Sequence, residues 1–300
     1  MVAYQGLTEP NFRGSGSRVI NGQQITASLR EAFELDMAKQ TSSLELADNA
    51  RGEVADLLDL QLSPLGLAAM DALAPQLGQT IVDIGCGAGQ TVQQLASRVG
   101  PSGRVIGVDI APRVLEVARS RTAALGQVQL IQADATTLAL PDAMADGVYS
   151  RFGVMALDDP IAAFANFRRI TRRGGRLAFV CWRSLEENEL DLVPLRAAGL
   201  DIPIDKTPFK FERRDYLFDV LRSAGFAKIE IKAFDARVSS GNLDAMMAVL
   251  TKVGALGRLL RETPALISTV EPKVRAVLLA GAGDHDICLK AATWMVSAVA

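Results

Sequence analysis

The stretch Thr80-Ile-Val-Asp-Ile-Gly-Cys-Gly-Ala-Gly-Gln-Thr91 decides the fold of this 300-residue chain. Ile81, Val82 and Ile84 predict a strand that is buried on both faces, as in a parallel sheet. The three alternating glycines that follow permit a tight turn and let a ligand lie directly against the backbone. The next residues, Gln90 to Val99, carry apolar side chains at helical spacing. A strand, a glycine turn and a helix in this order are typical of a nucleotide-binding α/β fold.

The spacing of these glycines separates two kinds of cofactor. The dinucleotide fingerprint is G-x-G-x-x-G, whereas Gly85, Gly87 and Gly89 have the spacing G-x-G-x-G. Asp83 lies at the mouth of the turn, where its carboxylate would repel a pyrophosphate but can accept hydrogen bonds from a cationic amino group. The pattern therefore favours a cationic cofactor without phosphates. A glycine-rich turn that binds nothing is the alternative interpretation.

The form Asp-x-Gly-x-Gly-x-Gly, from Asp83 to Gly89, resembles motif I of the class I S-adenosylmethionine (SAM)-dependent methyltransferases. Two further acids stand at the ends of predicted strands, Asp109 after strand 104–109 and Asp134 after strand 128–134. An acid at the end of the second strand is placed to bind ribose hydroxyls, in NAD and SAM sites alike. The resemblance implies that Asp134 contacts the adenine amino group, although an aspartate there also suits a helix cap.

The resemblance implies a set of site residues at the strand ends. The cofactor contacts would come from Asp83, Gly85, Cys86, Gly87, Gly89, Asp109, Ile110, Asp134, Ala135 and Ser150. The acceptor pocket would be lined by Arg151, Phe152 and Trp182, although the two aromatic residues suit a hydrophobic core equally well. The sequence does not identify a catalytic residue.

The second half of the core continues the resemblance. Helix 160–172 is predicted to end at the pair Gly174-Gly175, with strand 176–182 after it. The run 150–183 is similar to bacterial small-molecule methyltransferases close to the quinone-biosynthesis C-methyltransferases, but it departs at Arg173, where that group usually has proline. The resemblance implies an α/β fold with a Rossmann-like, doubly wound sheet of seven strands in the order 3-2-1-4-5-7-6, the last strand antiparallel, and helical cap elements.

The chain is predicted to have three parts. They are a flexible tail (1–18), an N-terminal helical cap (19–75), and a SAM-binding α/β core (76–300) with cap inserts at about 184–212 and 236–289. Within the cap, Ser63 and Pro64 are expected to begin a helix as its N-cap and first residue. The resemblance implies that the cap helices and both inserts cover the acceptor pocket.

Composition and charge narrow the classes of function. Hydrophobic residues make up 49% of the chain and charged residues 22%, which is ordinary for an enzyme with a substantial core. A net charge of −2 and a pI near 5.6 argue against general nucleic-acid binding. Three scattered cysteines and the lack of a predicted signal peptide or membrane span indicate a cytoplasmic protein. The oligomeric state, including a homodimer, stays open.

The expected chemistry needs neither a metal nor a covalent intermediate. The one histidine, His285, lies in a polar stretch, and no cluster has metal-ligand spacing. We expect direct in-line methyl transfer from SAM to a small, largely apolar metabolite, with S-adenosylhomocysteine (SAH) as product and neither nucleic acid nor membrane as partner. One alternative is an NAD(P)-dependent oxidoreductase. The glycine spacing and the lack of a Tyr-x-x-x-Lys pair argue against it. Another is a non-catalytic SAM-binding or scaffold protein.

Overall fold

The computed structural model describes residues 18–20, 23–25, 45–200, 203–282 and 287–300. The predicted flexible tail lies almost entirely outside these residues, and so does His285.

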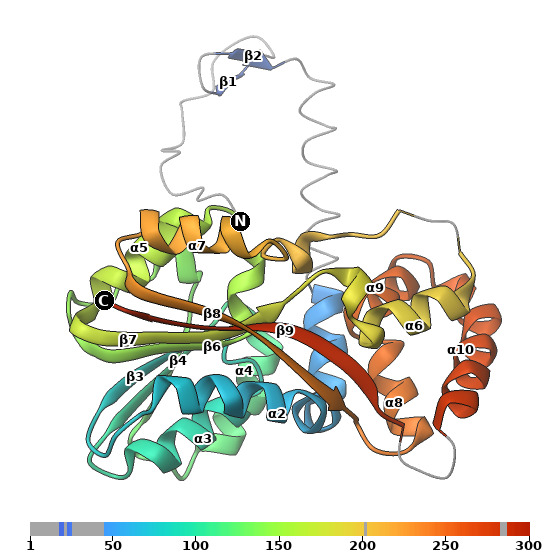
Figure 1. Ribbon diagram of the computed structural model, residues 1–300, viewed down its shortest axis with the longest axis horizontal. Coiled ribbons are helices and arrows are strands. Elements are labelled where there is room, and N and C mark those ends of the chain that lie inside the picture. The colour runs from blue at the N-terminus through green and yellow to red at the C-terminus, as the bar shows by residue number, and fades with distance from the viewer. Residues whose placement is uncertain (1–17, 21–22, 26–44, 201–202, 283–286) are drawn as a thin grey trace.

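A sheet of seven strands forms the centre of the described structure (Figure 1). Its spatial order is β5-β4-β3-β6-β7-β9-β8, which is 3-2-1-4-5-7-6 when the strands of this sheet are counted along the chain. β3 pairs in parallel with β4 and β6, whereas β9 is antiparallel to both β7 and β8. The predicted fold class is confirmed. The strands are β3 (Thr80–Ile84), β4 (Arg104–Asp109), β5 (Val128–Gln132), β6 (Ala145–Arg151), β7 (Thr171–Trp182), β8 (Ala227–Val238) and β9 (Leu289–Val299).

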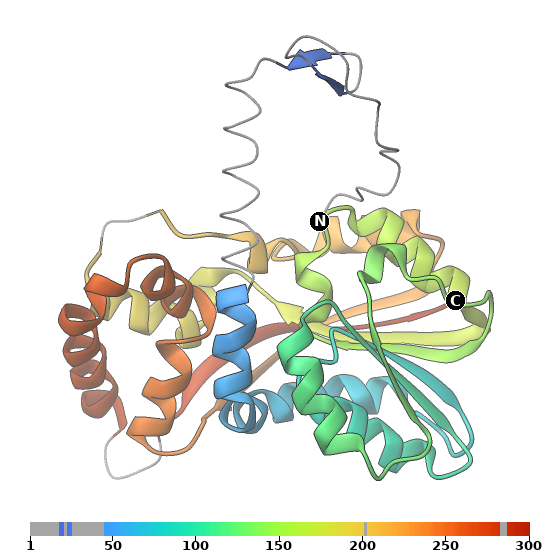
Figure 2. The ribbon, with the colours of Figure 1, turned by 180° about the vertical axis from the view of Figure 1, so that it is seen from behind.

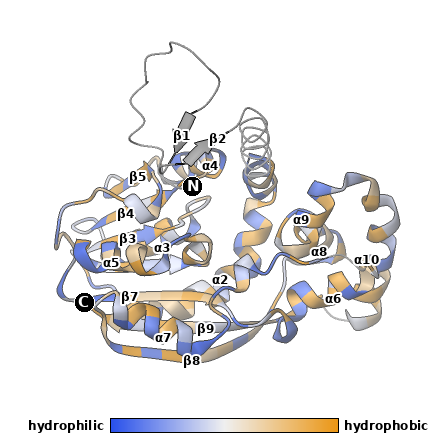
Figure 3. Cartoon of the chain, turned by 90° about the horizontal axis from the view of Figure 1, so that it is seen from above, coloured by the Kyte–Doolittle hydropathy of each residue, from blue (hydrophilic) through white to orange (hydrophobic). Residues whose placement is uncertain are grey.

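Helices cover both faces of this sheet (Figures 1 and 2). One face carries α2 (Ala55–Leu73), α3 (Gln90–Val99) and α4 (Pro112–Thr122), and the other carries α5 (Pro160–Ile170) and α7 (Arg214–Ser223). The second half of the inner strand β7 is hydrophobic, whereas the edge strand β8 alternates hydrophilic and hydrophobic residues (Figure 3). This contrast is expected, because an inner strand is buried on both faces and an edge strand is partly solvated.

Four helices form a separate group beyond the ends of β8 and β9, here called the helical lobe (Figures 1 and 3). They are α6 (Glu189–Ala198), α8 (Leu243–Leu250), α9 (Gly254–Glu262) and α10 (Ile267–Ala282). α6 falls in the first predicted insert and the other three in the second. Asp191 joins two of them, because its Oδ1 atom accepts a hydrogen bond of 2.9 Å from the backbone N–H of Ala255 at the start of α9.

The N-terminal part differs from a purely helical cap. β1 (Arg18–Ile20) and β2 (Gln23–Ile25) form an antiparallel two-stranded sheet, and residues 45–53 are helical. The expected helix start at Ser63 is wrong, since α2 begins at Ala55 and passes through Pro64. A proline inside a helix removes one backbone donor. The helix continues because its buried side chains, among them Leu65 and Met70, pack on the sheet.

The predicted boundary between α5 and β7 is also wrong. α5 ends at Ile170 and β7 begins at Thr171, whose backbone N–H is bonded to the Phe167 carbonyl. Thr171 pairs with Ala145 of β6, but the next pair in the register is Gly147 with Arg176. The Gly174-Gly175 pair therefore lies in an irregularity inside a strand and not at a helix end.

Candidate functional site

The predicted site residues meet at the carboxyl edge of the sheet, where β3, β4 and β6 end. Gly85 donates its backbone N–H to the carbonyl of Val108 over 2.8 Å, which joins the glycine turn to β4. Ser150 of β6 donates its hydroxyl to the carbonyl of Ile84 over 2.7 Å. In doubly wound sheets, ligands bind at this edge, at the point where the strand order reverses.

The three glycines of the turn have different roles, although each has a positive φ, between +53° and +86°. A Cβ atom on Gly85 would lie 2.5 Å from Gly153 Cα, and one on Gly89 would lie 2.9 Å from the Cβ of Ala118. A Cβ on Gly87 would have no described atom within 4 Å. Packing therefore requires glycine at the first and third positions, and the backbone of Gly87 is open to a ligand.

Asp83 is a buried carboxylate beside this turn. Its Oδ2 atom accepts a hydrogen bond of 2.5 Å from the Thr91 hydroxyl, whereas its Oδ1 atom has no hydrogen-bond partner in the described part of the chain. Burial raises the pKa of Asp83 to about 7, and the charge of Asp109 adds to this rise, while Thr91 and Arg151 oppose it. A cationic group would satisfy the Oδ1 atom and lower this pKa.

Asp109 links the end of β4 to the turn. Its Oδ2 atom accepts a hydrogen bond of 2.8 Å from Gly87 N–H, and its Oδ1 atom accepts one of 3.0 Å from Ala111 N–H. Burial raises the pKa of Asp109, and these two bonds oppose the rise. Each oxygen has a second lone pair, so the carboxylate can also accept bonds from ribose hydroxyls. The next side chain, Ile110, is 47% exposed and gives an apolar surface beside this carboxylate.

Three other predicted cofactor residues support the local structure. Asp134 caps the short 3₁₀ turn Ala135–Thr137 by accepting a hydrogen bond of 2.8 Å from Thr136 N–H. The capping interpretation of Asp134 is confirmed, and its adenine contact stays a prediction. Cys86 is buried, which raises the pKa of its thiol and leaves it unreactive. Ser150 is also buried, and its hydroxyl accepts a bond of 3.0 Å from Gly153 N–H.

The two aromatic residues predicted for the acceptor pocket lie together. The rings of Phe152 and Trp182 stack with centroids 4.0 Å apart and an interplanar angle of 24°. Phe152 has a φ of +61°, an unfavourable left-handed conformation for an aromatic residue. Strained backbone of this kind is concentrated at functional sites, where the surrounding structure enforces it.

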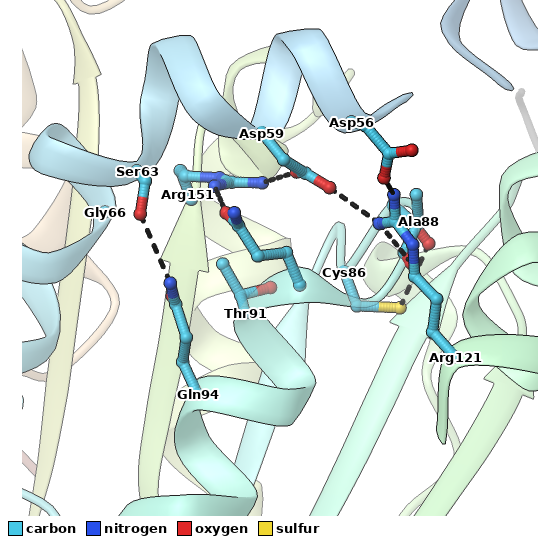
Figure 4. A network of polar contacts seen from close by, with 12 residues as sticks. Asp56, Asp59, Ser63, Gly66, Cys86, Ala88, Thr91, Gln94, Arg121 and Arg151 are labelled. Carbon is cyan, nitrogen blue, oxygen red and sulfur yellow. Dashed lines mark hydrogen bonds and ion pairs between the residues drawn. The ribbon is translucent and has the colours of Figure 1, made fainter. Parts of the chain in front are cut away.

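Arg151 contacts helix α2, an arrangement that the sequence did not suggest (Figure 4). Its guanidinium donates to Asp59 Oδ1 over 2.6 Å and to Gln90 Oε1 over 2.5 Å. The other oxygen of Asp59 accepts a bond of 2.6 Å from Arg121, which also donates to the Ala88 carbonyl over 3.0 Å and pairs with Asp56. An acid within the apolar run from Leu57 to Leu62 was the available signal for Asp59.

The described residues contain no group of three or more histidine, cysteine, aspartate or glutamate side chains placed to hold a metal ion. Among the helices they form, none has the length and apolar character needed to cross a membrane.

Comparison with known families identifies the core. Residues 82–179, from β3 to β7, match the family model described as a methyltransferase domain. The chain therefore contains a methyltransferase domain over these residues. SAM is the cofactor of this type of domain, and SAH is its product. The match begins at the buried strand that precedes the glycine turn and ends within the strand that carries Trp182.

Several relatives match parts of the chain. Aklanonic acid methyltransferase DauC of Streptomyces sp. (strain C5) is 36% identical over 119 residues, 39% of this chain and 54% of that protein. Demethylmenaquinone methyltransferase of Staphylococcus carnosus is 28% identical over 195 residues, 58% of this chain and 78% of that protein. An uncharacterized transposon protein of Streptomyces fradiae is 39% identical, with 43% of this chain and 38% of its own length covered. The chain thus spans about half or less of the first two curated relatives, those from Streptomyces.

Solved structures support the fold alone. The YcgJ protein of Bacillus subtilis superposes with a TM-score of 0.53 at 17% identity, over 78% of this chain and 97% of that protein. A methyltransferase structure from Bacillus halodurans C-125, titled putative, has a TM-score of 0.52 with the same identity and coverage.

Proposed function

We propose that this protein transfers a methyl group from SAM to a small, largely apolar metabolite. The observation that carries the proposal is the Asp83 carboxylate, which is buried beside the open backbone of Gly87. Within the described residues its Oδ1 atom has no partner. A buried carboxylate oxygen without a partner is stabilised by a cationic hydrogen-bond donor, and the ammonium of SAM is such a donor.

The same residues fit SAM better than a dinucleotide. Asp83 would accept hydrogen bonds from the ammonium, Asp109 from the ribose hydroxyls, and Ile110 would pack on the adenine. A pyrophosphate at this turn would meet the buried carboxylate of Asp83, and the two negative charges would repel each other. This repulsion argues against the alternative of an NAD(P)-dependent oxidoreductase.

The residues of the chain would act mainly by binding and orientation. SAM, when bound, supplies a methyl group on a sulfonium, so a good leaving group is already present. The glycine turn and Asp109 would fix the cofactor, and the stacked Phe152 and Trp182 would position an apolar acceptor and keep water away. An in-line displacement requires this alignment. We assign no general base to the reaction.

The small acceptor rests on the names of relatives, because the apolar side chains of the helical lobe, including Met246, Leu250 and Leu260, are buried and serve core packing. The names of two relatives specify demethylmenaquinone and aklanonic acid as acceptors rather than a nucleic acid or a protein. Together they favour a small molecule, and the acceptor atom stays open.

Isothermal titration with SAM, SAH and NAD tests the cofactor. We expect SAM and SAH to bind and NAD to fail, and preferential binding of NAD would favour the oxidoreductase. The acceptor is tested by measuring SAH release with a panel of apolar hydroxylated aromatic compounds, an RNA and a peptide. Binding of SAM without SAH release in any reaction would favour the non-catalytic alternative.

A further inference from the structure

We propose that Asp59 is a positioning residue that holds Arg151 away from Asp83, so that the Asp83 carboxylate is left to bind the ammonium of SAM. The inference rests on the proposed function, since it concerns the same cofactor site. Asp59 lies on α2, outside the residues matched by the methyltransferase family model.

Sheet geometry places Arg151 close to Asp83. Asp83 of β3 pairs with Tyr149 of β6, and paired residues of parallel strands point to the same face of a sheet. Arg151 is two residues beyond Tyr149, so it shares this face. Both side chains contact α2 at Gly66. The Tyr149 hydroxyl donates to the Gly66 carbonyl over 2.8 Å, and a Cβ on Gly66 would lie 2.7 Å from Arg151 Cδ.

A guanidinium near a buried carboxylate normally pairs with it, often through two parallel hydrogen bonds. Here the two hydrogen bonds of Arg151 go to Asp59 and Gln90. The side chains of Arg151 and Asp59 are only 11% and 9% exposed, so water screens this ion pair poorly. Figure 4 shows Asp59 between Arg151 and Arg121, where one carboxylate balances two cations next to the glycine turn.

Loss of the Asp59 charge should redirect Arg151. In Asp59→Asn, Arg151 would turn to the Asp83 carboxylate on the same face of the sheet, and the resulting ion pair would occupy the ammonium site with a cation. We therefore expect SAM affinity to fall by about tenfold or more, the loss of one charge-assisted hydrogen bond. Removal of Arg151 as well should restore the affinity, because no cation would then compete.

Isothermal titration of SAM into the full chain tests this rescue. Asp59→Asn should bind more weakly than the wild type, and Asp59→Asn/Arg151→Gln should recover about tenfold over the single variant. Asp56→Asn is the matched control, because Asp56 is on the same helix, is 94% exposed and, among the described residues, forms an ion pair with Arg121 alone. Its SAM affinity should stay within about twofold of the wild type, as expected for an exposed ion pair.

Two results would overturn the inference. One is an Asp59→Asn variant that binds SAM as tightly as the wild type does. The other is a double variant that binds SAM no more tightly than Asp59→Asn, which is the result expected if Asp59 only holds α2 in place. If a melting curve shows that Asp59→Asn is unfolded, Gln90→Ala releases the second bond of Arg151 and should show the same rescue by Arg151→Gln. A wild-type chain that fails to bind SAM would refute the proposed function itself.

Discussion

Substitution of Asp83 by asparagine should change how the stability of the protein depends on pH. The ordinary pKa of an aspartate carboxyl group is 3.8, and burial raises the pKa of Asp83 to about 7 in the folded protein. Between these two values the folded state binds more protons than the unfolded state, so stability falls as the pH rises. Above pH 7 the carboxylate is charged in both states, and the full cost of burying that charge reduces the stability of the folded state. A shift of about three units corresponds to about 4 kcal/mol, taken as an upper limit.

Asp83→Asn removes this titration and keeps most of the local structure. The asparagine oxygen can still accept the hydrogen bond from Thr91, and the new amide N–H₂ takes the place of the Oδ1 atom, which has no hydrogen-bond partner among the described residues. A buried donor left without a partner costs about 1–3 kcal/mol, so the net change at any single pH is small. The informative quantity is the difference in unfolding free energy between variant and wild type, which should grow by up to about 4 kcal/mol from pH 4 to pH 8.

Thermal or denaturant unfolding at several pH values measures this difference. For a chain of this size, 4 kcal/mol corresponds to a relative shift in Tm of about 6 °C. Asp142→Asn, which removes a carboxylate that is 77% exposed, controls for the loss of one charge. A difference between Asp83→Asn and wild type that stays constant from pH 4 to pH 8 would refute the assignment of a costly buried charge to Asp83.

Three further predictions follow from the geometry of the site. Gly87→Ala should lose about 1–2 kcal/mol of unfolding free energy and bind SAM poorly. Gly85→Ala should lose about 3 kcal/mol or more, because its new Cβ would meet Gly153, and equal melting temperatures of the two variants would contradict this. Asp109→Ala should weaken SAM binding by about tenfold or more in titration calorimetry, and unchanged affinity in a folded variant would reject the ribose assignment. Once an acceptor is known, EDTA should leave turnover within about twofold, and a thousandfold loss would reveal a metal requirement.

Local signals in the sequence were sufficient around the cofactor turn. β3, α3 and β4 have the predicted bounds, because buried apolar runs and glycines mark each start and end within a few residues. The strand order was also predictable, but only through the resemblance to the methyltransferases. Asp83, Asp109 and the glycines come to one edge of the sheet because parallel strands end there.

Local sequence signals gave wrong element boundaries where tertiary packing favoured a different structure. Ser63 and Pro64 have the residue types of a helix start, yet α2 runs through them because Asp59 before the proline and Gly66 after it both contact β6. The pair Gly174-Gly175 has the types of a helix end, yet Thr171 is already paired with β6. At Pro64, contacts with distant residues outweigh the cost of a proline inside a helix, about 3 kcal/mol, and at the glycine pair they outweigh about 0.5–1 kcal/mol per glycine in a strand.

The sequence by itself determined the glycine turn, its acids and the apolar strands around them, because these features depend on neighbours within a few residues. Only the tertiary structure decided the partners of Arg151 and the strained backbone of Phe152. Arg151 and Asp59 are 92 residues apart along the chain, and no periodicity relates them. Their pairing depends on where α2 lies over the sheet, and that position is set by the packing of side chains from many segments at once.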